Sequence, residues 1–328
     1  SFGRVLGVAD GEPHADQRRV VGRTFSPARM ARLESQAGAI ARRCIEGIRP
    51  WEVVDFVEAI AAPLPREIMT RLLGLPLEDE ERLQRGANHA IQLMSGLLSQ
   101  RELAEAFEIA KELEVYLEGR FEEALRNPRP DVTGDLARAV RAADLGGEGL
   151  QRWEAQGVLF QLVVGGIETT VGLIANCIRH AAEIPALWQR LRENPALVPD
   201  FIEEVIRIDP VAIGNYRRAT RDTELAGVAL PKGSTLHLLW GSANRDETQF
   251  PEPDRFRLDR PNNKSHLGFG RGKHFCLGAS LARMETRVAV GALLDRFEKI
   301  DLVDPAESLR HKPGLVVRRL ERLPAVAS

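Results

Sequence analysis

Apolar residues recur at helical spacing along most of the chain. This periodicity predicts amphipathic helices early in the sequence and a longer, more uniformly apolar helix near its middle. Pro63 and Pro65 interrupt the second of these stretches, and Asn127 and Pro128 end the fourth. The predicted helices cover 29–48, 51–73, 78–98, 101–126, about 150–183, 185–192 and 196–208.

The helical pattern gives way to strand signals between residues 210 and 239. The segment 225–233 indicates short strands joined by turns, and 315–320 is a further candidate strand. No composition shift or low-complexity stretch divides the sequence. We therefore expect one domain over residues 1–328, mainly α with a small β portion.

The charge balance and the cysteine spacing exclude several classes of protein. The 328 residues include 45 basic and 47 acidic side chains, for a net charge of −2, which argues against nucleic-acid binding through bulk charge. Cys44, Cys177 and Cys276 have unrelated spacings, which excludes a disulfide framework and a CxxC metal site. Such usage fits a reducing compartment.

No apolar run reaches the length of a membrane span. The longest candidate, 157–178, is interrupted by polar residues: Gln161, Glu168, Thr169, Thr170 and Asn176. No signal-peptide pattern opens the sequence. We therefore expect a cytoplasmic protein without a membrane partner.

The run from Phe269 to Gly278 carries the most specific chemistry. Its three glycines allow a tight turn, and a strong helix former follows Cys276. The sulfur would therefore lie at a helix N-terminus, where free N–H groups and the macrodipole favour thiolate over thiol. A thiolate in such a setting suits a haem iron. Taken alone, the run is equally compatible with a buried structural cysteine.

This run resembles the haem-thiolate signature of the cytochrome P450 family. The resemblance implies the P450 fold, with a long central helix over a haem b whose axial iron ligand is Cys276. It also implies that Phe269 packs beside the ligand, that His274 binds a haem propionate, and that Gly270 and Gly278 shape the loop. Four further segments match the family in the same order along nearly the entire chain.

One of these segments, Gly165 to Thr170, lies inside the long predicted helix. A mid-helix glycine costs about 1 kcal/mol relative to alanine, so the pair calls for a reason. Close helix packing is one reason. The other is a site in which Thr169 bonds back to the carbonyl of Gly165 and Gly166 leaves room for a diatomic ligand.

The segment resembles the oxygen-activation motif of the family. By that resemblance, Thr169 would hydrogen-bond iron-bound dioxygen and Glu168 would help deliver protons. The motif favours a monooxygenase that uses dioxygen and external electrons over a peroxide-driven enzyme.

Glu204 and Arg207 form an ExxR pattern on a predicted helix, about 70 residues before the cysteine loop. Alone, such a pair is commonplace on a helix surface. In the family, the ExxR pair closes a buried triad with an arginine from a Pro-x-Arg-Phe segment. Because this chain has Pro253-Asp254-Arg255-Phe256, the resemblance implies a structural triad of Glu204, Arg207 and Arg255.

Three basic residues match propionate-binding positions of the family. His14 and Arg18 are four residues apart and share one face of a predicted helix. Arg217 matches a further propionate position. A solvated charged face is the alternative for the first pair.

The sequence departs from the family at its start. Only Ser1 to Pro13 precede the His14 helix, where the family has further strands and a substrate lid. Either this is a naturally short member or an N-terminal portion is missing. By family position, an apolar pocket is expected from Leu162, Val163, Val211, Ala212 and Ile213, although apolar stripes often belong to the core.

The leading hypothesis is therefore a monooxygenase that hydroxylates or epoxidises an apolar small molecule with dioxygen. The sequence carries no flavin or iron–sulfur module, so electrons are expected from a ferredoxin and its reductase. Arg271 and Lys273 beside the cysteine loop are candidates for docking an acidic donor. The alternatives are a peroxide-driven haem oxidase and a non-catalytic, partner-binding relative.

Overall fold

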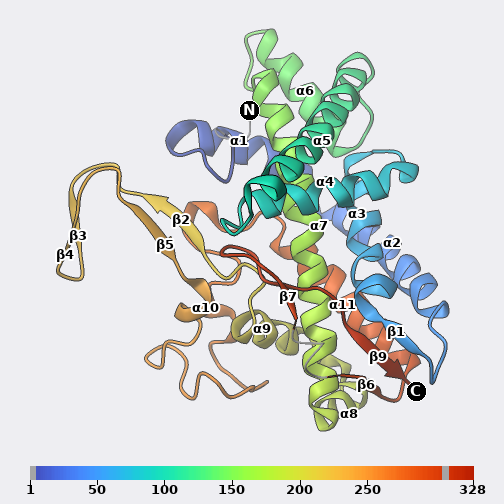
Figure 1. The fold of residues 1–328 in the computed structure, drawn as a ribbon. Helices are drawn as coiled ribbons and strands as arrows, with labels where there is room; N and C mark the ends of the chain where they lie inside the picture. The colour runs from blue at the N-terminus through green and yellow to red at the C-terminus, as the bar shows by residue number, and fades with distance from the viewer. Residues whose placement is uncertain (1–4, 305–309) are drawn as a thin grey trace.

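The structure is a computed structural model that describes residues 5–304 and 310–328 (Figure 1). It is mainly helical, as predicted. The helices are α1 (Gly11–Thr24), α2 (Pro27–Glu46), α3 (Pro63–Leu73), α4 (Glu80–Leu93), α5 (Gln100–Arg126), α6 (Val132–Asp144), α7 (Arg152–Glu183), α8 (Pro185–Glu193), α9 (Val198–Ile208), α10 (Trp240–Ala243) and α11 (Ala279–Arg296).

The strands form small antiparallel sheets. In the three-stranded sheet, β9 (Pro324–Ala327) lies between β1 (Val53–Asp55) and β6 (Ile300–Leu302). The two-stranded pairs are β2 (Asn215–Arg218) with β5 (Thr235–Leu238), β3 (Thr223–Leu225) with β4 (Val228–Leu230), and β7 (His311–Lys312) with β8 (Arg319–Leu320). The β3–β4 hairpin extends the β2–β5 ribbon into an arm that projects from the body (Figure 1).

Local sequence explains where the two longest helices begin. Ser99 and Glu102 form a reciprocal capping box at α5. At α7 the backbone N–H of Gln151 donates to the carboxylate of Glu154 at 2.8 Å. α7 is long and apolar enough to cross a membrane, but 72% of its most apolar window is buried inside the protein. It is therefore the core helix on which α3, α4, α5, α6, α8, α9 and α11 pack.

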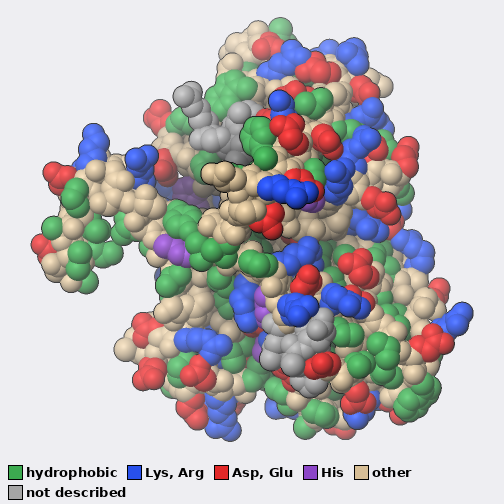
Figure 2. Space-filling view, viewed as in Figure 1, with side chains coloured by type: hydrophobic (Ala, Val, Ile, Leu, Met, Phe, Trp, Pro, Cys, Tyr) green, Lys and Arg blue, Asp and Glu red, His purple; other side chains and the backbone are tan. Residues whose placement is uncertain are grey.

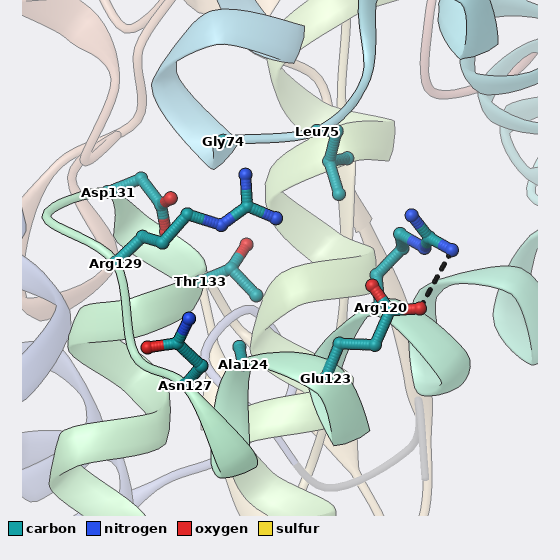
Figure 3. Close-up of a pocket in the computed structure, with 9 residues that line it drawn as sticks. All are labelled: Gly74, Leu75, Arg120, Glu123, Ala124, Asn127, Arg129, Asp131 and Thr133. Carbon is teal, nitrogen blue, oxygen red and sulfur yellow. Dashed lines mark hydrogen bonds and ion pairs between the residues drawn. The ribbon is translucent and has the colours of Figure 1, made fainter.

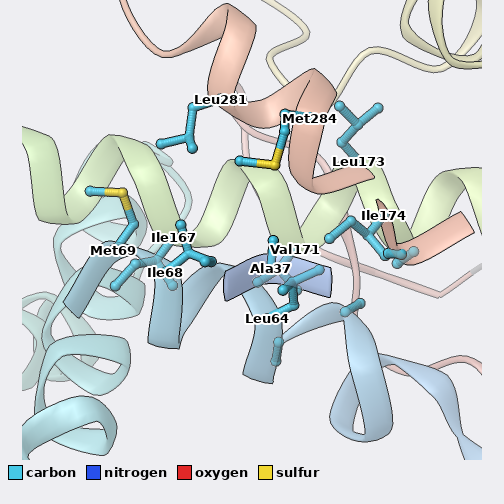
Figure 4. Close-up of a cluster of buried hydrophobic side chains, with 14 of the residues drawn as sticks. Ala37, Leu64, Ile68, Met69, Ile167, Val171, Leu173, Ile174, Leu281 and Met284 are labelled. Atoms are coloured by element: carbon cyan, nitrogen blue, oxygen red, sulfur yellow. The ribbon is translucent and has the colours of Figure 1, made fainter. Parts of the chain in front are cut away.

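The core surrounds α7. Leu64, Ile68 and Met69 of α3 pack on one side of it, and Leu281 and Met284 of α11 pack on another (Figure 4). Leu281 lies close to the N-terminus of α11, directly after the cysteine loop. The packing of α11 on α7 therefore brings that loop to the central helix.

Several predicted boundaries were wrong. Residues 53–55 form β1 instead of helix, because they pair with β9 from the opposite end of the chain. α4 ends at Leu93, and Gly96 takes a left-handed φ of +69°. α6 was not predicted, and the candidate strand 315–320 is a strand only at Arg319–Leu320.

Candidate functional site

The cysteine loop makes the tight turn that its glycines predict. Gly270 and Gly272 have φ values of +69° and +73°, which only glycine adopts without strain. The backbone N–H of Cys276 donates to the carbonyl of Phe269 at 2.9 Å and closes the loop. α11 begins at Ala279, so the sulfur lies at a helix N-terminus as predicted.

Two opposing effects act on the pKa of the Cys276 thiol. Surrounding protein atoms desolvate the sulfur and raise its pKa. Backbone N–H groups of Gly278 and Ala279 and the charges of Arg18 and Arg283 act the other way. The predicted stabilisation of thiolate is thus present, but in the protein alone desolvation outweighs it. As a residue, Cys276 remains exposed and accessible to a ligand.

A buried ion-pair network anchors the loop from behind. Arg283 of α11 contacts Glu203 of α9 through Nε at 2.5 Å and through a second nitrogen at 2.8 Å. Its guanidinium lies 4.5 Å from the ring centroid of Phe269. His266 also contacts Glu203, at 3.0 Å. Phe269 is therefore held beside the loop by a network that sequence analysis did not identify, since its members lie on three separate segments.

His14 and Arg18 of α1 both reach the cysteine loop. Arg18 donates to the carbonyl of Phe275 at 2.6 Å, and the rings of His14 and His274 have centroids 4.2 Å apart. Burial lowers the pKa of His14, and the neighbouring His274 and Arg18 lower it further. The helical spacing of the pair therefore brings both residues to the cysteine loop. Their role in propionate binding stays a prediction.

Arg217 is placed differently. It lies on β2 and is exposed, and one guanidinium nitrogen donates to the carbonyl of Tyr216 at 2.8 Å. Among the described residues, no hydrogen bond or ion pair joins it to His14, Arg18 or His274. The structure thus leaves its predicted role in propionate binding as a proposal.

On α7, Thr169 makes the predicted back-bond, with Oγ1 donating to the carbonyl of Gly165 at 2.6 Å. The open position next to it is Gly165: a Cβ added there would meet nothing within 4 Å. A Cβ on Gly166 would lie 2.6 Å from the sulfur of Met69. The expectation that Gly166 leaves room for a ligand was therefore wrong, because Gly166 faces α3 and Gly165 faces the open side.

Glu168, one residue before Thr169 on α7, is buried. Its Oε2 forms an ion pair with Nε of Arg319 at 2.8 Å, and its Oε1 accepts from Gln84. Neither partner was predicted. No local pattern marks them, since Gln84 lies on α4 and Arg319 on β8.

The buried triad exists, but with a different third member. Arg207 contacts Glu204 at 2.7 Å, and Arg260 contacts it at 2.9 Å. Arg255 was the predicted partner, yet its side chain is 69% exposed and pairs with Glu252. Only its backbone carbonyl takes part, as an acceptor for Arg260 at 2.7 Å. The prediction of Arg255 was wrong because two arginines lie five residues apart and only packing distinguishes them.

The predicted pocket residues divide into two groups. Val163 is fully buried in the core, and Val211 is buried against Gly172 of α7, so neither lines an open pocket. Leu162, Ala212 and Ile213 are partly exposed. Ile213 donates its N–H to Val316, which fixes the 211–213 segment against the loop before β8.

The residues present fit a haem. The cysteine is accessible at a helix N-terminus, and Gly165 and Thr169 offer an open, small-residue face on the helix that packs against α11. His14, Arg18 and His274 form a cationic and polar group suited to carboxylates beside the same loop. Figure 2 shows a hollow between the projecting arm and the body, with histidine side chains in its depth.

A separate cavity of about 210 Å³ lies between the ends of α3 and α5 and the start of α6 (Figure 3). Arg120 and Glu123 pair across 2.9 Å on one side of it, and Arg129 and Asp131 lie on the other. The cavity contains none of the residues predicted from sequence. Its mixed charges favour no single ligand class.

Comparison with known proteins identifies the class that this site defines. The sequence profile described as cytochrome P450 matches residues 87–323. Cytochrome P450 144 of Mycobacterium tuberculosis is 37% identical over 97% of this chain and 72% of its own length. The cyclomarin C epoxidase CymV of Salinispora arenicola is 33% identical over 97% of this chain and 80% of its own.

Solved structures agree with this result. Cytochrome P450 CREJ, in complex with (4-ethylphenyl) dihydrogen phosphate, superposes with a TM-score of 0.93 at 28% identity, covering 98% of this chain and 79% of its own. The site is thus that of a haem-thiolate protein of the monooxygenase class. The chain belongs to the cytochrome P450 family.

Proposed function

We propose that this chain binds haem b through Cys276 and uses dioxygen to hydroxylate or epoxidise an apolar small molecule. The observation that carries the proposal is the pairing of two features: an exposed cysteine at the start of α11 and the open Gly165–Thr169 face of α7, on which α11 packs. The bound haem would supply the oxygen activation, as haem-thiolate groups do.

The residues of the chain have distinct tasks in this proposal. Cys276 holds the iron. Gly270, at a φ of +69°, lets the backbone turn before it, and Gly278 is the N-cap residue of the helix that follows. His14, Arg18 and His274 bind propionate, with Arg217 on β2 as a further candidate. Thr169 presents a hydroxyl at the open face of α7, and the adjacent Glu168 supplies protons.

An apolar substrate is supported by the partly exposed aliphatic residues near the open face. Leu162 on α7 and Ala212 and Ile213 before β2 remain candidates for contacting it. One relative is an epoxidase, which supports epoxidation as one of the two reactions. We also propose a cytoplasmic location, in keeping with the three free cysteines.

A ferredoxin with its reductase is the proposed electron donor. Arg271 and Lys273 are both exposed on the cysteine loop, where they can attract an acidic protein. Changing both to glutamate should slow reduction by the ferredoxin and leave reduction by dithionite unchanged. Equal slowing by both reductants would contradict the docking role.

The absorption spectrum of the reduced, haem-loaded protein under carbon monoxide tests the proposal. A strongly red-shifted Soret band is expected, and Cys276→Ser should abolish it, whereas Cys44→Ser should not. A band at the position of histidine-ligated haem would contradict the assignment. Turnover with redox partners, compared with turnover on peroxide, then separates a monooxygenase from a peroxide-driven oxidase.

A further inference from the structure

A small cavity lies beside Glu168 of the oxygen-activation motif. Its volume is about 20 Å³, enough for one water molecule. Polar residues from three elements line it: Glu168 from α7, Asn88, Gln92 and Ser95 from α4 and the turn after it, and Lys312 and Arg319 from the β7–β8 hairpin. A water there would find the two to four polar partners that buried waters need.

The two cations at this cavity have different chemistry. Arg319 is buried and forms an ion pair with Glu168 at 2.8 Å, so it holds the carboxylate in place. Its guanidinium does not lose a proton at physiological pH, so it is no proton source. Lys312 carries an amine that can lose one. Its Nζ donates to Oδ1 of Asn88 at 3.0 Å, which positions the amine at the cavity wall.

Unused hydrogen-bonding capacity also points to a bound water. Nε of Arg319 is buried and, despite its closeness to Glu168, makes no hydrogen bond of acceptable geometry with any described group. Oε1 of Gln84, whose amide nitrogen donates to Glu168, is likewise buried without a partner among the described residues. Buried polar atoms are rarely left unsatisfied, and of these two residues Arg319 lines the cavity. A water bound there would give its Nε a partner.

We propose that Lys312 is the proton donor to Glu168, acting through one water held in this cavity. The inference deepens the proposed function and rests on it. In this step, the water gives a proton to the Glu168 carboxylate and takes one from the Lys312 ammonium. The resulting neutral amine, which is only partly buried, then regains a proton from solvent.

The surroundings of Lys312 ease this exchange. Burial lowers the pKa of its ammonium, and the nearby charge of Arg319 lowers it further. The carboxylates of Glu168, Glu321 and Glu58 oppose that shift. The balance leaves the amine a stronger acid than an ordinary surface lysine.

The hairpin that carries Lys312 and Arg319 is held rigidly. A Cβ at Gly314 would lie 2.4 Å from the carbonyl of Val317, so the tight turn requires glycine. Leu315 donates to the carbonyl of Ser95 at 3.3 Å, and Arg318 donates to that of Val211 at 2.8 Å. The hairpin is therefore positioned by the turn that follows α4 and by the 211–213 segment.

Two measurements test the inference without turnover. A crystal structure of the haem-loaded protein should show an ordered water in contact with Lys312 and Glu168. A dry cavity would overturn the inference. In the diamagnetic ferrous carbon monoxide form, the side-chain NMR signal of Lys312, assigned with Lys312→Met, should titrate at lower pH than those of exposed lysines. Titration together with the exposed lysines would also overturn it.

Kinetics then separate a proton donor from a structural cation. Lys312→Met and Lys312→Arg should both lower turnover by on the order of tenfold, less than loss of a direct general acid, and divert electrons to hydrogen peroxide. Lys232→Met, in an exposed turn, should behave as wild type. Restored turnover in Lys312→Arg would show that only the charge matters and would overturn the inference. A wild-type protein without turnover would instead contradict the proposed function, while the two direct measurements still test the relay.

Discussion

Glu204 and Arg260 lie 56 residues apart in the sequence and form an ion pair of 2.9 Å in which neither side chain is more than 2% exposed. The guanidinium of Arg260 also donates to the carbonyls of Pro251 and Glu252, each at 2.7 Å. The pair therefore ties α9 to the irregular segment that leads into the cysteine loop. Removing the partner of a buried charge in this position leaves an uncompensated charge and destabilises the fold.

The first prediction concerns this ion pair. Arg260→Met should lower the free energy of unfolding by about 3–5 kcal/mol, because it leaves the Glu204 carboxylate buried with one cation fewer. Arg255→Met is the matched control, and its exposed side chain should matter by no more than about 0.5 kcal/mol. Chemical denaturation and haem content after expression measure both. A larger loss from Arg255→Met than from Arg260→Met would restore the sequence-based assignment.

Acid stability should depend on Glu203. Burial alone would raise the pKa of this carboxyl, but hydrogen bonds from Arg283 and His266 outweigh burial and lower it from 4.5 to about 2. A lowered pKa contributes stability above the unfolded value, and this contribution is lost as the pH falls from 4.5 towards 2. Glu203→Gln should therefore cost up to about 3 kcal/mol at neutral pH and progressively less in acid.

Urea unfolding of Glu203→Gln across this pH range provides the measurement. Glu247→Gln, at an exposed site, is the control. Because Arg283 also stacks on Phe269, the variant should bind haem more weakly as well. A stability difference that is constant with pH would show that the carboxylate charge is not what holds the network.

Sequence reasoning succeeded where short-range signals decide the outcome. The helix that carries His14 and Arg18, the loop that ends at Cys276 and the back-bond of Thr169 each follow from spacing within a few residues. The predicted bounds of α5 and α7 likewise lie within two residues of the observed ones, and Pro128 and Pro185 follow their ends closely. These features need no knowledge of the tertiary structure.

It failed where partners come from distant segments. Nothing near Glu168 in the sequence indicates Arg319, which lies on β8, and β1 exists only because β9 pairs with it. The choice of Gly165 over Gly166 as the open position also depends on where Met69 of α3 packs. Such choices depend on three-dimensional packing, which single-sequence patterns do not contain.

We expect the buried carboxyl of Glu285, on α11, to lower the free energy of unfolding at neutral pH. The side chain is fully buried, and neither carboxyl oxygen has a hydrogen-bond partner among the described residues. Burial raises the pKa of this carboxyl well above its usual value. A raised pKa means that stability is retained below the unfolded value of 4.5 and is lost as the pH rises above it.

Replacement of Glu285 should therefore stabilise the protein. Glu285→Met should raise the free energy of unfolding at neutral pH by about 1–3 kcal/mol, because it removes a poorly solvated acid and keeps the volume filled. The gain should shrink below pH 4.5, where the carboxyl is protonated in both states. Thermal unfolding at acidic and neutral pH measures this. Destabilisation at neutral pH would indicate that Glu285 binds an internal water or ion.

The two glycines of α7 should respond differently to the same substitution. Gly165→Ala places a methyl group in open space and should gain about 0.5–1 kcal/mol of stability from helix propensity. Gly166→Ala should instead lower stability by about 1 kcal/mol, since the displacement of Met69 outweighs that gain. In the haem-loaded protein, Gly165→Val should weaken carbon monoxide binding, whereas Gly166→Ala should leave it nearly unchanged. The reverse order of effects on carbon monoxide affinity would show that Gly166 faces the ligand, as the motif alone suggested.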